Sequence, residues 1–484
     1  MTSTLQPPPP PNAEDQMWPP ERELWRIRPS AAVLASVVIG GVAFDVGIRH
    51  PMGLLSFLAI ALTAVAGIYG GWVRGPLARR FVVLALLPAS MLMLRDSAWL
   101  TPLNIAAVII LLVLAVAVRP EPNALGRALG RMLHPVGATE PAVRSVELIA
   151  RSAGAAVIGH DRLGRRLLRL ARGLALGAPV VAVLATLLAA SDALFRSWFD
   201  SPFGIVTAVE HSFFVAFGGA LTAALAGHGA WAEVRPAGQP RRPLGPTEAS
   251  IVLAGVVVTY AGFVVAQVIA ITAGAGYVER TTGLTYAEYA RAGFFQLVAA
   301  AVLTLLVLVG IRRYRQPSSP RVARRLRALE LSTVGLTLAV VLVAIRRLFL
   351  YEAEFGLTML RLSTILFAAF IGFVFVLTGL SIAGRLGREP IELALAGALV
   401  LLLGSNIANP EAIVAERNIE RFGGTSELDV SYLVLNLGTD ALPAMLSDPA
   451  VSSVLCAAPP EIDDRAIVFN WSRDRAADAL ADAC

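Results

Sequence analysis

The sequence predicts an all-α protein: a polytopic transmembrane helical bundle of about eleven spans with its N-terminus inside, followed by a small helical extracytoplasmic C-terminal domain. Hydrophobic residues make up 56% of the 484 residues and charged residues only 16%, with a mean hydropathy of +0.67. A soluble chain could not bury that much apolar surface. The apolar residues also gather in runs of membrane-spanning length, and arginines gather in alternate segments between the runs.

The N-terminal residues 1–24 are expected to form a disordered cytoplasmic tail. They contain the proline run Pro7–Pro11 and many polar residues, a composition that does not support a packed core. The order of charges and apolar residues differs from that of a cleavable signal, so the first apolar run is expected to remain as an anchor.

Eleven apolar runs are candidate spans, because roughly 20 apolar residues cross the hydrocarbon layer. They divide into a four-span N-terminal segment, 25–118, and a seven-span bundle, 173–404. The third and eleventh runs are short, so each is either re-entrant or longer than these limits. The runs are 31–48, 52–70, 81–94, 99–118, 173–193, 203–227, 247–275, 293–311, 331–350, 363–383 and 391–404.

The basic residues predict the sidedness of the spans. The chain has no lysine, so its 41 basic residues are all arginine. With eleven spans, the arginine-rich loops all fall on the side of the N-terminus, which is then cytoplasmic. Residues 405–484 are therefore expected outside. The arginine-rich loops are 71–80, 119–172, 228–246, 312–330 and 384–390.

The arginine-only composition, with abundant Ala, Gly, Val and Leu, is typical of a GC-rich bacterial genome. We therefore expect a multi-pass protein of the bacterial plasma membrane. The basic cytoplasmic loop 119–172 contains either amphipathic helices on the inner leaflet or a simple connector. Because the arginines lie beside apolar runs, they are topology signals, and a nucleic-acid partner is rejected.

Polar side chains within the runs predict an intramembrane polar cluster. Under the expected topology all of them lie in the outer halves of their spans, where they would face the bundle interior and pair. The alternative is that they lie at the interface and extend outward to water. No metal site is predicted, because no second histidine or cysteine lies at ligand spacing from His211. The cluster comprises Asp45, Glu210, His211, Gln267, Gln296, Arg346 and Arg347.

A charged, tyrosine-rich segment, residues 276–295, lies between two predicted spans. Thr285-Tyr-Ala-Glu288 fits a capping box, so the segment either starts a helix with interfacial tyrosine anchors or contacts a ligand. Segments 277–285 and 351–358 share Gly-Leu-Thr, which suggests a weak repeat of helix hairpins. Candidate ligand-binding residues here and in the C-terminal domain are Glu279, Arg280, Tyr286, Glu288, Tyr289, Arg291, Glu354, Arg361, Glu416, Arg417 and Arg421.

The C-terminal domain is expected to be helical. Asn409-Pro410-Glu411 is typical of a helix start, and Gly423 would end that helix after Phe422. Further helices are expected in 426–447 and 472–483. Cys456 and Cys484 either pair, worth roughly 3.5 kcal/mol, or stay free because Cys484 is terminal. The absence of CxxC argues against a redox or zinc motif.

Several segments together resemble a known group of proteins. They are Tyr286–Phe295, Tyr351–Arg361, Asn409–Arg421, Leu428-Asp-Val-Ser-Tyr432 and Leu437-Gly-Thr-Asp440-Ala-Leu-Pro443. The chain resembles the bacterial polytopic membrane proteins of the domain-of-unknown-function families 4153 and 4173, over roughly residues 170–480. The resemblance implies membership and an outward-facing site, and it brings no established chemistry. The family pattern more often has arginine at position 292, where this chain has Ala292.

Three functions are consistent with these features. The nearly charge-free inner halves favour an envelope sensor or accessory binding protein. The weak hairpin repeat favours a transporter or lipid flippase, although most transporters need polar groups near the midplane. A membrane-embedded transferase acting on a lipid-linked substrate outside is the third. No cofactor is expected. Membrane lipids, an envelope protein or a lipid-linked ligand are the expected partners, and the oligomeric state is open.

Overall fold

The computed structural model describes residues 52–69, 75–117, 162–197, 244–273, 294–316, 319–386, 390–462 and 469–484. Within these ranges the chain is helical, with no strand beyond an isolated bridge between Leu244 and Arg315. Six of the described helices are long and apolar enough to cross a membrane. The predicted class, an all-α multi-pass membrane protein, is confirmed at this level.

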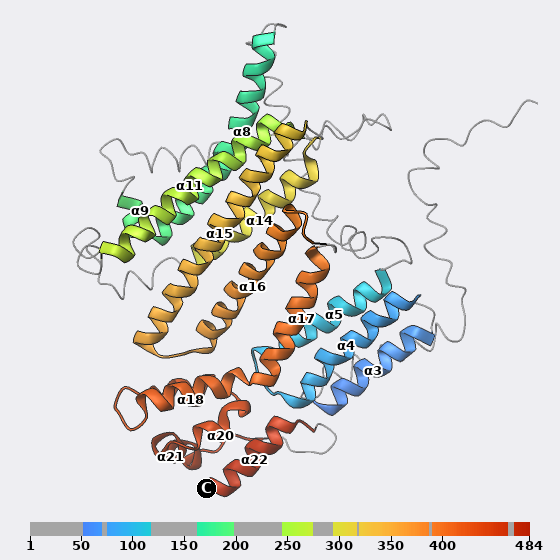
Figure 1. Cartoon of the computed structure of the whole chain (residues 1–484). Helices are drawn as coiled ribbons and strands as arrows, with labels where there is room; N and C mark the ends of the chain where they lie inside the picture. Colours follow the sequence, from blue (N-terminus) through green and yellow to red (C-terminus); the bar gives the residue numbers. More distant parts are fainter. Residues whose placement is uncertain are drawn as a thin grey trace, which may run out of the picture.

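The largest group of helices lies side by side (Figure 1), and two clusters of buried apolar side chains join them. Tyr260, Phe263 and Leu188 lie fully buried in one of these clusters. Helices α8 and α11 approach closely at Gly255, where an added Cβ would lie 2.5 Å from Val181 Cγ2. The group comprises α8 (Arg162–Ser191), the short α9 (Ala193–Ser197), α11 (Pro246–Ala273), α14 (Phe294–Tyr314), α15 (Pro320–Phe355) and α16 (Met359–Ile382).

A second group contains α3 (Leu54–Tyr69), α4 (Pro76–Leu94) and α5 (Leu100–Ala117). Helix α17 (Pro390–Ala408) lies between the two groups and contacts α16, α4 and α5 (Figure 1). Val400 and Ile407 of α17 are 70% and 73% exposed, as suits a helix that faces lipid. Its Asn406 is buried and exchanges amide hydrogen bonds of 2.9 and 3.0 Å with Asn104 of α5.

The C-terminal helices lie across the ends of the spans (Figure 1). They share an apolar core that includes Val414, Leu433 and Val451, together with Leu357 and Met359 from the α15–α16 connection. Cys456 and Cys484 form a disulfide with a Cα–Cα distance of 5.4 Å. The elements are α18 (Pro410–Phe422), α19 (Val430–Asn436), the 3-10 helix η2 (Thr439–Ala441), α20 (Leu442–Met445), α21 (Pro449–Ala457) and α22 (Trp471–Ala483).

Two predicted C-terminal helices are confirmed, and one is wrong. Helix α18 has the predicted limits, and the Asn409 side chain caps it by accepting from the N–H of Ala412. Helix α22 matches the prediction for 472–483. The single helix expected over 426–447 is instead broken into α19, η2 and α20. The break occurs at Gly438, whose extended backbone closely approaches Glu411 and the loop before α5.

The predicted runs within the described residues coincide with helices, but their limits differ. The third and eleventh runs extend to the 19 residues of α4 and α17. Helix α15 begins at Pro320, inside the predicted loop 312–330, so that loop is wrong in its limits. Hydropathy marks the part of a helix in the membrane, whereas this helix continues into polar sequence, where buried Glu330 pairs with Arg315 at 2.8 Å. Runs 31–48 and 203–227 lie outside the described residues.

Candidate functional site

The C-terminal helices meet the spans at the turn between α15 and α16. Gly356 has a positive φ of 74°, and the Thr358 side chain caps α16 by accepting from the N–H of Arg361. The Arg361 guanidinium donates to the carbonyl oxygens of Phe355 (2.9 Å) and Gly356. It also lies 4.1 Å from the centroid of the Tyr351 ring. Arg361, a predicted ligand-binding residue, therefore closes the helix hairpin.

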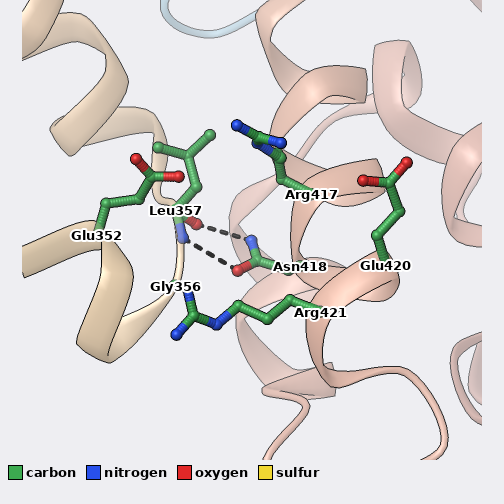
Figure 2. Close-up of a pocket in the computed structure, with 7 residues that line it drawn as sticks. All are labelled: Glu352, Gly356, Leu357, Arg417, Asn418, Glu420 and Arg421. Atoms are coloured by element: carbon green, nitrogen blue, oxygen red, sulfur yellow. Dashed lines mark hydrogen bonds between the residues drawn. The ribbon is translucent and has the colours of Figure 1, made fainter. Parts of the chain in front are cut away.

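Asn418 of α18 ties this hairpin to the C-terminal helices (Figure 2). Its Nδ2 donates to the carbonyl of Leu357 at 2.7 Å, and its Oδ1 accepts from the N–H of Leu357 at 3.0 Å. A third bond joins Nδ2 to the carbonyl of Val414 at 2.8 Å. A Cβ at Gly356 would lie only 2.5 Å from Asn418 Oδ1. Glycine is therefore required at this position for two reasons: its positive φ and the close approach of α18.

A pocket of 340 Å³ opens beside this junction, near the lower limit of typical ligand sites. It is charged on both sides, because α15 contributes a glutamate and α18 contributes two arginines and a glutamate (Figure 2). Arg421 reaches across and donates to the carbonyl of Ala353. The lining residues are Glu352, Gly356, Leu357, Arg417, Asn418, Glu420 and Arg421.

Two predicted site residues, Arg417 and Arg421, line this pocket, whereas Glu416 is exposed elsewhere on α18. Glu352, Asn418 and Glu420 line it without having been predicted. For α18 the signal is helical spacing, because residues three and four apart share a face. Glu354 belongs to α15, but its side chain lies outside what the structure describes. The other predicted ligand-binding residues also lie outside the described ranges: Glu279, Arg280, Tyr286, Glu288, Tyr289 and Arg291.

A second polar site lies inside the large helix group. Arg347 of α15 is 2% exposed and forms an ion pair with Asp192, between α8 and α9. Gln267 of α11 accepts from Arg347 at 3.1 Å and donates to Asp192 at 2.7 Å. The carbonyl of Ser191 also accepts from Arg347, at 2.7 Å. Three helices thus meet at one buried polar triad, Asp192–Gln267–Arg347.

Of the predicted intramembrane cluster, the structure brings Gln267 and Arg347 together. Arg346 is exposed and Gln296 is half-buried on α14, so adjacent Arg346 and Arg347 have different surroundings. Sequence reasoning missed Asp192, although it falls inside the run 173–193, where a charge is itself a signal. Asp45, Glu210 and His211 lie outside the described residues.

A third polar site joins the loop between α4 and α5 to the C-terminal helices. Glu411 of α18 is 1% exposed and accepts from Ser97 Oγ at 2.5 Å and from the N–H of Gly438 at 2.7 Å. Asp440 lies 3.6 Å from the Arg95 guanidinium. Burial raises the pKa of both Glu411 and Asp440, and their mutual repulsion adds to the shift at Glu411. We call these residues, Arg95, Ser97, Glu411 and Asp440, the carboxylate junction.

The described residues hold no group of three or more histidine, cysteine or acidic side chains arranged to bind a metal ion. The polar sites that the described residues do form are the small charged pocket beside α18, the buried Asp192–Gln267–Arg347 triad and the carboxylate junction.

Comparison with known proteins identifies a family for this chain but no characterised relative. No curated protein and no solved structure matches the chain. The family model described as a domain of unknown function, DUF4153, matches residues 81–447. That match covers the large helix group, α17 and most of the C-terminal helices, including all of the pocket residues. The chain therefore belongs to the DUF4153 family.

Proposed function

We propose that this protein is an envelope sensor or accessory protein that binds a ligand in the pocket between the α15–α16 hairpin and α18. The observation that carries the proposal is the construction of this pocket. The buried side chain of Asn418 ties α18 to the hairpin backbone, and Arg361 closes the hairpin itself. Because these contacts hold the backbone on both sides of the pocket, a ligand would spend little free energy on ordering that backbone.

The proposal places the pocket on the outer face of a bacterial plasma membrane, with the N-terminus inside. The directions of the helices support a common face for the pocket and the C-terminal helices. Helices α4, α15 and α17 end there, and α5 and α16 begin there, beside the C-terminal helices. The arginine-rich loops support the cytoplasmic assignment of the opposite face. Reporters fused after Arg172 and Ser426 test this, and an outside signal for the first fusion refutes it.

The binding proposal is tested by identifying the compounds that remain bound to the purified protein. The full chain is purified in nanodiscs made directly from its native membrane, and bound compounds are identified by mass spectrometry. The pocket variant is Arg417→Gln with Glu352→Gln. The control is Arg475→Gln, an exposed arginine of α22 that stacks on Trp471. A compound kept by the wild type and the control but lost from the pocket variant supports the site. Identical contents in all three refute it.

A transporter is the second candidate, and the buried Asp192–Gln267–Arg347 triad favours it. Ionisable side chains inside a membrane bundle commonly mark a pathway for substrate or protons. The compound retained by the pocket is supplied to proteoliposomes. Uptake that Asp192→Asn abolishes while binding persists favours transport. Binding without uptake in the wild type favours the binding protein.

A further inference from the structure

We propose that the pocket recognises a ligand that carries both a phosphoryl group and a primary ammonium group, as the headgroup of an aminoethyl phospholipid does. This inference rests on the proposed binding function and names the chemistry of its ligand. Four features of the pocket support it: the balance of its charges, the charged side chains that have no partner within the described chain, the absence of aromatic rings from its lining and its position at the ends of two spans.

The pocket is charged but balanced. Arg417 and Arg421 contribute two positive charges, and Glu352 and Glu420 contribute two negative charges. A simple anion would meet two carboxylates and a simple cation would meet two guanidinium groups, so either would be opposed by like charges. A ligand with separated charges of both signs satisfies all of them. The pocket composition therefore selects for a zwitterion.

The charged side chains of the pocket differ in whether they already have a partner in the protein. Arg421 already donates to the carbonyl of Ala353 and lies 5.0 Å from the Phe422 ring centroid. Within the described chain, no hydrogen bond or ion pair joins the side chains of Glu352, Arg417 and Glu420 to other residues. In Figure 2, Glu352 and Arg417 lie on opposite sides of the pocket, one on α15 and the other on α18. A ligand between them would bridge the hairpin to the C-terminal helices.

Arg417 and Glu352 determine which chemical groups the two ends of the ligand carry. The planar guanidinium of Arg417 presents paired N–H donors that match phosphoryl oxygens. The carboxylate of Glu352 accepts hydrogen bonds, which a primary ammonium donates and a quaternary ammonium cannot. Quaternary ammonium groups are usually bound by aromatic cages. The pocket lining includes no aromatic side chain, and the nearby Tyr351 ring is covered by Arg361.

The position of the pocket favours a lipid as the source of this headgroup. It lies where α15 ends and α16 begins, which is the depth expected for headgroups at the end of a span. Phe355 and Leu360, on either side of the turn, are 52% and 53% exposed. These apolar side chains offer a surface for acyl chains beside a charged pocket. A free aminoethyl phosphate has the same charged groups but would gain nothing from that surface.

The test uses the purified full chain in nanodiscs that contain phosphatidylcholine alone or phosphatidylcholine with phosphatidylethanolamine. Thermal unfolding and native mass spectrometry report binding. We expect phosphatidylethanolamine to raise the unfolding temperature and to stay bound, and soluble glycerophosphoethanolamine to compete for the site. Arg417→Gln and Glu352→Gln should each weaken binding by about tenfold, the loss of one charge-assisted hydrogen bond. Arg417→Lys should weaken it less, and Arg475→Gln should leave it unchanged.

The different ligands and variants in this experiment distinguish the possible outcomes. Tighter binding of the lipid than of glycerophosphoethanolamine supports a lipid source, whereas equal binding supports the same chemistry in a free compound. Stronger binding of phosphatidylglycerol or inorganic phosphate, with Glu352→Gln having no effect, overturns the zwitterion inference and leaves the proposed binding function intact. Absence of any pocket-dependent ligand overturns both. Each variant is first shown to elute and unfold like the wild type without added ligand, so misfolding is not mistaken for lost binding.

Discussion

The hydrogen bonds of Asn418 predict that one side chain holds the C-terminal helices against the membrane bundle. Asn418→Ala removes both bonds to Leu357 and leaves its buried N–H and C=O groups without their partner. An unsatisfied buried polar group costs about 1–3 kcal/mol. Two such groups give an expected destabilisation of about 2–4 kcal/mol, allowing for partial access of water. The bond from Asn418 to Val414 lies within α18 and adds little.

The assay is chemical unfolding of the full chain in detergent micelles, followed by circular dichroism and by hydrogen exchange. Exchange should increase at Gly356–Arg361 and along α18, and should stay unchanged in α4 and α5. Asn436→Ala is the matched control, because Asn436 is exposed at the end of α19. A loss below about 0.5 kcal/mol, the scale of surface substitutions, or equal losses in both variants, would refute the role assigned to Asn418.

Three further predictions concern the other polar contacts. Glu411→Gln should flatten the pH dependence of stability. Burial raises the folded-state pKa of Glu411 above its ordinary 4.5. The unfolding free energy of the wild type should therefore fall as the pH rises from 4.5 through the folded-state pKa. Unfolding midpoints of the wild type and the variant, measured over this pH range, test the prediction. Arg347→Met removes the cation beside buried Asp192 and should cost about 3–5 kcal/mol, and adding Asp192→Asn should recover much of that loss in thermal unfolding; equal stability of the single and double variants contradicts this. Cys484→Ser opens the disulfide to Cys456, which spans 28 residues, and should destabilise α21 and α22 by about 3.5 kcal/mol; hydrogen exchange measures the change, and a reductant should then affect only the wild type.

The carboxylate junction shows why parts of the site could not be predicted. The sequence assigns Glu411 a favourable place in the first turn of a helix, and the structure keeps it there. Its partner Ser97 is 314 residues away in the chain. No local pattern reports that α5 begins beside α18. The buried environment that raises the pKa of Glu411 is therefore a property of the assembled helices.

The pocket was predictable in part. The sequence analysis named Arg417 and Arg421 as candidates, and their spacing of four residues places both arginines on one face of α18. It also pointed to Arg361, whose observed role is to close the hairpin. Glu352 carried no comparable signal, and for Asn418 the sequence offered only its helical spacing from Arg421. Their roles depend on the distance between α15 and α18, which Gly356 sets by accepting the close approach of Asn418.

The sequence by itself determined the helical membrane class, the approximate positions of the apolar helices within the described residues, the start and end of α18 and the presence of α22. These features depend on apolar runs matched to the hydrocarbon thickness and on caps that act within one helical turn, so neighbouring residues contain the necessary information. Tertiary structure alone decided that Arg347 meets Asp192, 155 residues away, and that Asn418 meets Leu357, 61 residues away. Such contacts arise only when helices pack, because hydrogen bonds and ion pairs act over a few ångströms and the chain does not record which helices will be neighbours.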